Sequence, residues 1–398
     1  MANLNGKEYS RSDLLARIGN TSQVCGVERV TLADGREQGV EALLFDTGSG
    51  FSFTALPGRG MDISRAAYNG LSLCWRSAVG QVGPSYFERA GFGWLRSFFG
   101  GLLTTCGLTD VGDPCVDPDL GRDSWQAAIR EAAAGRCDTA VEEIRRAMLA
   151  DQVNATGIHG RISNTPAERV SVSCEWEGDD CVISASGTVR EANSFGEDLS
   201  LRRTICSKLG ERKLSVHDVV VNEGYEPTPH MILYHLNAGF PVLDADSRLI
   251  LPTRQVIPRD AEAEQGRDAY AGFGPPTPGF QEQVFYHDLA GDSDGKTCAA
   301  IVNERIADGL GLYVRFSLRQ LPRFVQWKML GERTYVVGLE PANCWVGGRS
   351  SERKRGTLQI LEPGESRNYD LEIGVLVGSE IAAFSENAMD LLADNGGA

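Results

Sequence analysis

Basic residues are too few in this sequence to indicate a nucleic-acid-binding protein. The 398-residue chain has 39 lysines and arginines against 54 aspartates and glutamates, which gives a net charge of −15 at pH 7. Proteins hold nucleic acids mainly by neutralising phosphates with clustered basic side chains. The acidic balance therefore argues against a nucleic-acid partner. It fits a neutral small-molecule ligand better than a polyanion.

The sequence also lacks a long apolar run. No stretch of about 18 consecutive apolar residues occurs, so no transmembrane helix is expected. Residues 1–20 are polar and mixed in charge, without the apolar core of a signal peptide. We therefore expect a cytoplasmic protein that has no membrane partner.

Closely paired cysteines are missing as well. The chain has 10 cysteines, but none of them forms a CxxC pair, so a zinc ribbon or a thioredoxin-type site has no support. Their scatter along the chain is typical of small buried hydrophobic side chains. Disulfide pairing stays open at this point.

Patterns of short β-strands fill most of the chain. Clusters of Gly, Pro, Asn and Asp separate them, as at Asn222–Pro229 and 362–365. So many strands at short spacing predict an all-β fold, a sandwich or a barrel. The predicted strand runs are 51–54, 170–176, 182–189, 199–206, 213–221, 298–303, 311–317, 323–328, 334–339 and 369–377.

One segment departs from the strand pattern. Residues 123–149 are rich in Ala, Glu and Arg, with apolar residues at helical spacing and two capping-box patterns around Gly135. We predict a helical hairpin at 117–152, inserted within a single β-sandwich domain that spans 1–398. The hairpin is interpreted as a packing or oligomer element, with a lid over a site as the alternative.

Histidine is scarce, with only five in the chain, and His235 is the most informative. In a strand, its side chain would share a face with Met231, Leu233 and Asn237, while His230 would point to the other face. A His and an Asn on one face beside apolar neighbours can donate hydrogen bonds into a pocket. The alternative is a histidine satisfied within the core.

Two further polar residues stand out by position. Glu340 ends the apolar strand 335–339 and precedes Pro341, where a carboxylate is expected to face either solvent or a site. Its alternative is an ordinary turn carboxylate. His159 lies between Ile158 and Gly160, in a glycine-bounded segment that permits close backbone approach to a ligand.

These residues lie in segments that resemble the aldose 1-epimerase (galactose mutarotase) family. The segment 219–237 (VVVNEGYEPTPHMILYHLN) resembles a strand ending in Asn, a turn reaching Pro, and a strand carrying the family histidine. The segments 158–160 and 338–341 are similar to its Leu-His-Gly and Leu-Glu-Pro segments. The segments 56–63 and 339–343 resemble a less characterised branch, mostly of unassigned function. The resemblance covers roughly residues 40–375 and implies a large antiparallel β-sandwich of the galactose mutarotase type, with a sugar on a concave sheet face.

The resemblance also implies residue roles. His235 matches the residue that protonates the sugar ring oxygen, Glu340 the base that removes the anomeric hydroxyl proton, and His159 a histidine on the ring-oxygen side. Asp288 is the match for an aspartate that binds sugar hydroxyls. The further substrate-binding candidates are Arg59, Asp62, Arg161, Asn237, His287 and Lys328.

For two of these candidates, a structural role is the alternative to ligand binding. Arg59 and Asp62 lie in the glycine-bounded segment 56–63, where they either form an ion pair that positions the loop or reach the ligand. The sequence also departs from the family pattern at 235–240, where the usual aromatic-Asn-Leu is absent. The choice of substrate therefore stays open.

The expected function is the interconversion of sugar anomers by Glu/His acid–base catalysis, with no cofactor and a small-molecule sugar as partner. The first alternative is a keto-sugar isomerase, epimerase or lyase, with or without a divalent metal; if it is metal-dependent, the expected ligands are His159, His235, His287 and Glu340. The second is a non-catalytic sugar-binding module. Exposed sheet edges make a homodimer a further expectation.

Overall fold

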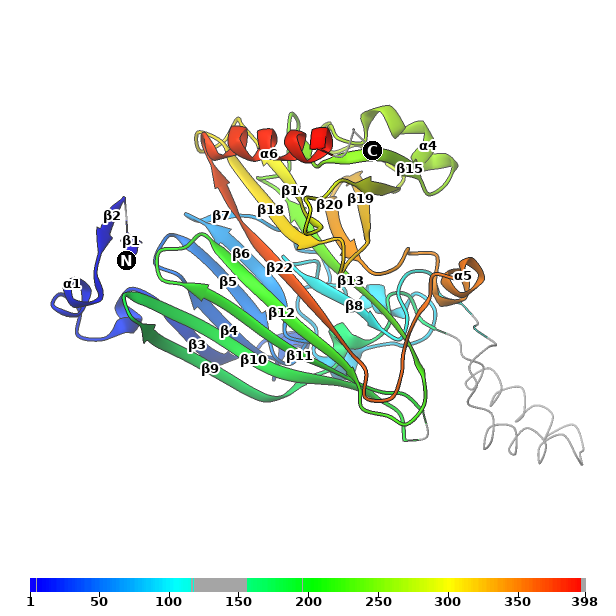
Figure 1. Ribbon diagram of the computed structural model, residues 1–398, viewed down its shortest axis with the longest axis horizontal. Coiled ribbons are helices and arrows are strands. Elements are labelled where there is room, and N and C mark those ends of the chain that lie inside the picture. Colours follow the sequence, from blue (N-terminus) through cyan, green and yellow to red (C-terminus); the bar gives the residue numbers. More distant parts are fainter. Residues whose placement is uncertain (5, 116, 118–155, 195, 395–398) are drawn as a thin grey trace, which may run out of the picture.

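The computed structural model describes residues 1–4, 6–115, 117, 156–194 and 196–394. Antiparallel strands form nearly all of its regular structure, and helices are short and peripheral (Figure 1). Each predicted strand run lies within an observed strand. The predicted all-β class is therefore confirmed.

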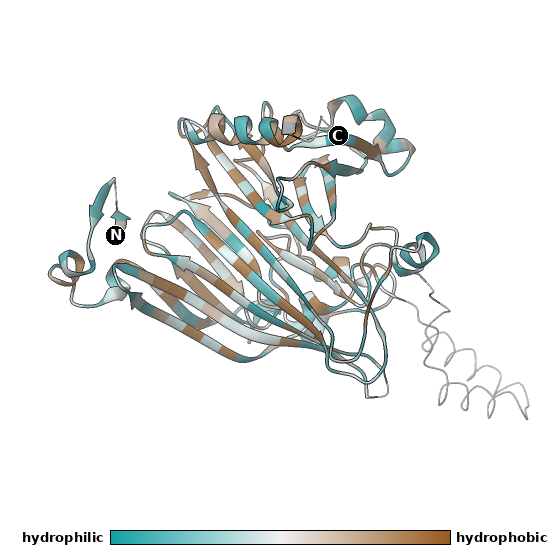
Figure 2. Cartoon of the chain, in the orientation of Figure 1, coloured by the Kyte–Doolittle hydropathy of each residue, from teal (hydrophilic) through white to brown (hydrophobic). Residues whose placement is uncertain are grey.

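The largest sheet has eight strands within the described ranges. Its central strands alternate buried side chains with partly or fully exposed ones, and Figure 2 shows the matching alternation of hydropathy. In spatial order the strands are β14 (Arg248–Ile250), β17 (Lys296–Asn303), β18 (Leu310–Ser317), β22 (Ser366–Val377), β12 (Lys213–Asn222), β11 (Asp198–Lys208), β10 (Asp180–Ala192) and β9 (Ala167–Glu177).

A second sheet carries the residues of greatest interest. Its central strand β13 is buried at every position, because both of its faces are covered. In spatial order the strands are β15 (Thr253–Pro258), β16 (Gln283–Leu289), β19 (Arg323–Gly331), β20 (Thr334–Ala342), β13 (Thr228–Gly239) and β21 (Gln359–Leu361), and β8 (Thr104–Leu108) also pairs with β13.

The N-terminal part of the chain forms two smaller sheets. One is a short pair, β1 (Ala2–Leu4) with β2 (Lys7–Tyr9). The other is a meander of β3 (Gly26–Thr31), β4 (Glu41–Asp46), β5 (Phe51–Leu56), β6 (Asp62–Tyr68) and β7 (Leu71–Ser72).

One hydrophobic core joins the three larger sheets. Phe45 and Phe53 come from the meander, Leu201 comes from the eight-stranded sheet, and Ile232 and Leu236 come from β13. Burial of such a continuous apolar core between sheets is what holds a sandwich together. The fold is therefore the predicted antiparallel β-sandwich.

Helices occupy the periphery. The longest, α6 (Glu380–Asp394), packs Ile381, Phe384 and Leu391 against the end of the large sheet, as Figure 1 shows in red. The other α-helices are α1 (Arg11–Leu15), α4 (Ala261–Gln265) and α5 (Arg349–Arg355). Short 3₁₀ turns lie at η1 (Thr21–Gln23), η2 (Gly35–Glu37), η3 (Pro84–Tyr86), η4 (Gly93–Arg96), η5 (Ile162–Asn164) and η6 (Arg267–Ala269).

The predicted helical hairpin at 117–152 lies outside the described residues, apart from Asp117. The carboxylate of Asp117 is buried and accepts hydrogen bonds from Arg349 and Arg353. In the part of the chain that the structure describes, no helix is both long enough and apolar enough to cross a membrane.

Candidate active site

His235 and Glu340 meet at the centre of the second sheet. The Nε2 atom of His235 lies 3.2 Å from Oε1 of Glu340, and both side chains are almost fully buried. His235 is on β13 and Glu340 on β20, which are adjacent antiparallel strands. The contact therefore joins residues that are 105 positions apart in the sequence.

Strand register explains this contact. The pairs Leu233–Ala342 and Leu236–Leu339 place His235 directly opposite Glu340. Directly opposed residues on antiparallel strands project to the same face, with Cβ atoms about 4.5–5.5 Å apart. The predicted facing of β13 also holds: Ile232 and Leu236 join the core between the sheets, whereas His235 turns to the other side.

A glycine makes room for the carboxylate. A Cβ atom at Gly338 would meet Oε1 of Glu340 and would crowd Trp327. Gly338 lies two positions before Glu340 on the same face of β20, so its missing side chain lets the carboxylate fold back beside His235. The contact between His235 and Glu340 therefore requires a glycine at position 338.

His159 approaches the pair from a loop. Its backbone φ is +60°, a left-handed conformation that is uncommon for histidine. The N–H of Gly112 donates to Nδ1 of His159 at 3.4 Å, which leaves the ring proton on Nε2. The ring lies 5.9 Å from that of His235, centroid to centroid. His159 is thereby set as a hydrogen-bond donor beside the pair.

The three side chains line one cavity of about 650 Å³. This volume is within the usual range for a small-molecule site. Its walls are largely aromatic, and the rings of Phe98 and Trp327 each lie 5.4 Å from the His235 ring. The other large aromatic side chains of the wall are Trp75, Phe92, Trp94 and Phe280.

An ion pair supplies charge to the cavity wall. Arg259 donates to Glu282 at 3.0 Å, and both residues line the cavity. Trp327 Nε1 donates to the second oxygen of Glu282, also at 3.0 Å. The carboxylate thus fixes the orientation of one aromatic wall, while Arg259 also pairs with Asp260 at 2.8 Å.

Burial shifts the pKa values of the three central groups. It holds the pKa of His235 well below the ordinary value, and nearby His159 lowers it further. It raises the pKa of Glu340 well above the ordinary value, and the charge of Glu282 adds to this. Burial lowers the pKa of His159 to about 4. A nearby carboxylate by itself would favour the charged form of His235, but desolvation outweighs that attraction here.

Arg59 and Asp62 lie away from the cavity. The buried guanidinium of Arg59 donates to backbone carbonyls, including those of Ser163 and Ser97. Asp62 instead accepts from Arg203 at 3.0 Å and from Thr105. Both residues position the loop 56–63, although not through the ion pair with one another that the sequence suggested.

Two other candidates are neighbours of site residues in the sequence but bind protein groups. Arg161 is two residues from His159, yet its guanidinium pairs with Glu197 at 2.6 Å and with Glu191 at 3.4 Å. The amide of Asn237 donates to the backbone carbonyl of His235 at 2.9 Å. Neither is among the described residues that line the cavity.

Three candidates point elsewhere. His287 contacts Gln326 at 3.1 Å through Nε2, and Asp288 is exposed beside Arg254. Lys328 donates to the carbonyls of Ala269 and Gly272, with its ammonium over the Phe273 ring. Of the ten predicted site residues, the cavity brings together His159, His235 and Glu340.

The alternative metal set does not assemble. His287 lies outside the cavity lining and is held by Gln326, as above. Among the described residues, the one group of three potential ligands with atoms within 4.8 Å of each other is Cys25, Cys174 and Cys181.

Several lining residues were not predicted from the sequence. The tryptophans at 75, 94 and 327 are among them. Arg259 and Glu282 carried no signal, because they reach the cavity from loops whose proximity depends on sheet order. The strand pairing of the sheet brings Arg259 and Glu282 to the cavity, whereas their spacing in the sequence gives no indication of it.

Solved structures share this fold. A candidate aldose 1-epimerase from Klebsiella pneumoniae aligns with a TM-score of 0.80 and 26% identity, over 93% of this chain and 88% of that one. A galactose mutarotase-like protein from Clostridium acetobutylicum gives a TM-score of 0.56 and 14% identity, over 89% and 99%. A galactose 1-epimerase from Lactobacillus acidophilus gives 0.54 and 12%, over 89% and 99%.

The sequence itself gives one family assignment. No curated protein is significantly similar to the chain. Residues 37–375 match the model of a domain of unknown function, DUF4432. Its β-sandwich fold is that of the aldose 1-epimerase-like and galactose mutarotase-like structural neighbours. Because the family match covers most of the chain, the chain belongs to the DUF4432 family.

Proposed function

We propose that this chain is a carbohydrate-active enzyme that interconverts the anomers of an aldose, with His235 and Glu340 as its acid–base pair. The observation that carries the proposal is their contact of 3.2 Å inside an aromatic-walled cavity. The fold shared with aldose 1-epimerase-like proteins supports the same reaction class. His159 is proposed as a donor to a ligand oxygen.

The reaction needs two proton transfers. One group removes the proton from the anomeric hydroxyl while another protonates the ring oxygen, and the bond between C1 and the ring oxygen breaks. The open-chain aldehyde rotates about its C1–C2 bond and closes on the other face. Both transfers then run in reverse, so each group regains its starting state. Glu340 takes the base role and His235 the acid role.

Burial determines where the shared proton rests before the sugar binds. The raised pKa of Glu340 and the lowered pKa of His235 both favour a proton on Glu340 and a neutral imidazole. Moving this one proton across the 3.2 Å contact gives carboxylate and imidazolium, the forms the reaction needs. The net charge of the pair does not change during that transfer.

The cavity wall suits a sugar. Apolar faces of a pyranose or furanose ring can pack on Trp75 and Trp327, while hydroxyls reach His159, Arg259 and Glu282. A neutral aldose also fits the acidic chain better than a polyanion does.

The test follows anomer exchange by NMR over a panel of hexoses, pentoses and deoxyhexoses. The proposal expects acceleration of at least one aldose by the wild-type protein. The panel is repeated in deuterium oxide to detect exchange of carbon-bound protons. Exchange at carbon without anomer interconversion would instead indicate the keto-sugar reaction.

A further inference from the structure

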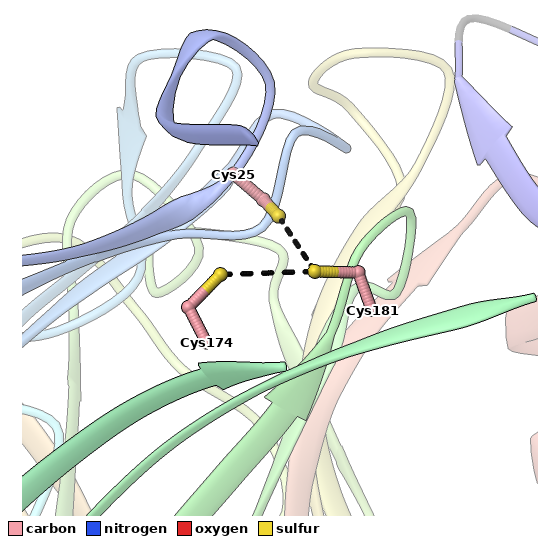
Figure 3. Close-up of side chains that lie close together, drawn as sticks. All are labelled: Cys25, Cys174 and Cys181. Atoms are coloured by element: carbon pink, nitrogen blue, oxygen red, sulfur yellow. Dashed lines mark hydrogen bonds between the residues drawn. The ribbon is translucent and has the colours of Figure 1, made fainter. Parts of the chain in front are cut away.

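Three cysteines from separate parts of the chain meet at one point, away from the cavity. Sγ of Cys181 lies 3.6 Å from Sγ of Cys25 and 3.7 Å from Sγ of Cys174 (Figure 3). All three sulfurs lie within 4.8 Å of each other. None of them is among the described residues that line the cavity.

The three come from two different sheets. Cys25 directly precedes β3 of the meander, whereas Cys174 and Cys181 lie on β9 and β10, the hairpin at the edge of the eight-stranded sheet. Cys25 and Cys181 are buried, and Cys174 is exposed. The sequence suggested buried small hydrophobic residues, which does not account for an exposed cysteine whose sulfur turns to the other two.

A disulfide explains the cluster poorly. The pairs Cys181–Trp176 and Ile183–Cys174 make Cys174 and Cys181 diagonal neighbours on adjacent strands. Diagonal Cα atoms lie about 7–8 Å apart, while disulfides need about 4.4–6.8 Å. A bond between Cys25 and Cys181 would leave the third sulfur unused.

The spacing fits thiolate ligands around one metal ion. With Zn–S bonds of about 2.3 Å, two sulfurs of a tetrahedral site lie about 3.8 Å apart. The observed Sγ–Sγ distances of 3.6 and 3.7 Å are close to this value. We propose that Cys25, Cys174 and Cys181 form a site for a thiophilic divalent metal ion, with zinc as the expected ion. Three protein ligands leave the fourth position for water, on the exposed side of Cys174.

Cysteine binds metal ions as the thiolate, so an ion that enters the cluster would displace the thiol protons. A bound ion would tie the meander to the outer hairpin and would stabilise the chain without entering the reaction at His235.

The test uses the full untagged chain, reduced and freed of metal, with Co²⁺ as the spectroscopic probe. We expect one equivalent of Co²⁺ to give a thiolate-to-cobalt charge-transfer band that Zn²⁺ removes. Zn²⁺ should also protect three thiols from a thiol reagent and raise the melting temperature. The exposed Cys174→Ser keeps the fold and should lose at least tenfold in Co²⁺ affinity.

The matched control is Cys206→Ser, a half-buried thiol on β11 outside the cluster. It should bind Co²⁺ as the wild type does. The proposal is overturned if the reduced wild type gives no charge-transfer band. It is also overturned if Cys174→Ser retains the band, or if the protein isolated without reductant holds a Cys25–Cys181 disulfide and binds no Co²⁺ after reduction.

Discussion

At the residue scale, a buried histidine and a buried glutamate lie in contact, with Nε2 of His235 3.2 Å from Oε1 of Glu340. Each group alone would be costly to desolvate in its charged form. Burial favours the neutral form of each, because it raises the pKa of Glu340 and lowers that of His235. In the proposed reaction, one proton crosses from Glu340 to His235 when a sugar hydroxyl lies beside the pair.

Removing either member of the pair should abolish turnover and leave the fold intact. Glu340→Gln and His235→Asn are close in shape and remove the proton exchange, so we expect losses of roughly 10²–10⁴-fold in kcat/KM. The exposed His217→Asn, whose partner is Asp370, is the control. Sugar binding by both the wild type and Glu340→Gln, with no rate acceleration by either, would support a non-catalytic binding module.

The pKa shifts predict an unusual pH dependence. The active pair carries one mobile proton, which is lost only above the raised pKa of Glu340, well above 4.5. A second proton is gained only below the lowered pKa of His235, well below 6.5. We therefore expect kcat/KM to stay level as the pH falls through 6.5 and to decline only at lower pH. An acid-side midpoint at or above pH 6.5 would contradict these shifts.

At the element scale, the register of β13 against β20 creates the site. The sequence predicted both strands and the facing of His235, because alternation along a strand is local. It did not predict that His235 lies opposite Glu340, since register depends on the whole sheet. The role of Glu340 rested on family resemblance, and Gly338 gave no signal.

Adding one methyl group at Gly338 should therefore harm the site more than the fold. In Gly338→Ala the new Cβ displaces the Glu340 carboxylate, and we expect at least a tenfold loss in kcat/KM. The cost in stability should be about 1–3 kcal/mol. Gly274→Ala, where a Cβ meets nothing within 4 Å, is the control. Steady-state kinetics and urea unfolding give the two readouts, and unchanged kinetics in Gly338→Ala would refute this role.

At the scale of the whole molecule, the sandwich was predictable but its polar interior was not. Strand runs and turn clusters predicted the class of fold. The buried Arg203, which joins Asp62 of the meander to Asp218 of the large sheet, carried no signal in the sequence. Tyr234 donates to the same Asp218, so this network lies directly behind His235. Such contacts depend on how the sheets pack against one another, which local patterns in the sequence do not predict.

Breaking this network should destabilise the protein strongly. Arg203→Met leaves two buried carboxylates without their cation, at an expected cost of about 3–5 kcal/mol in the free energy of unfolding. Arg202→Met, on the exposed face of the same strand, should cost less than 1 kcal/mol. Urea denaturation of both variants measures the difference, and equal midpoints would show that the network contributes nothing.

The most direct test of the proposed function is the rate of α/β anomer interconversion, measured by NMR exchange over the aldose panel with wild-type protein and Glu340→Gln at equal concentration. The acid–base pair predicts clear acceleration of at least one aldose by the wild type and a loss of roughly 10²–10⁴-fold in Glu340→Gln. No acceleration of any aldose by the folded wild-type protein, or equal rates for the two proteins, would contradict it.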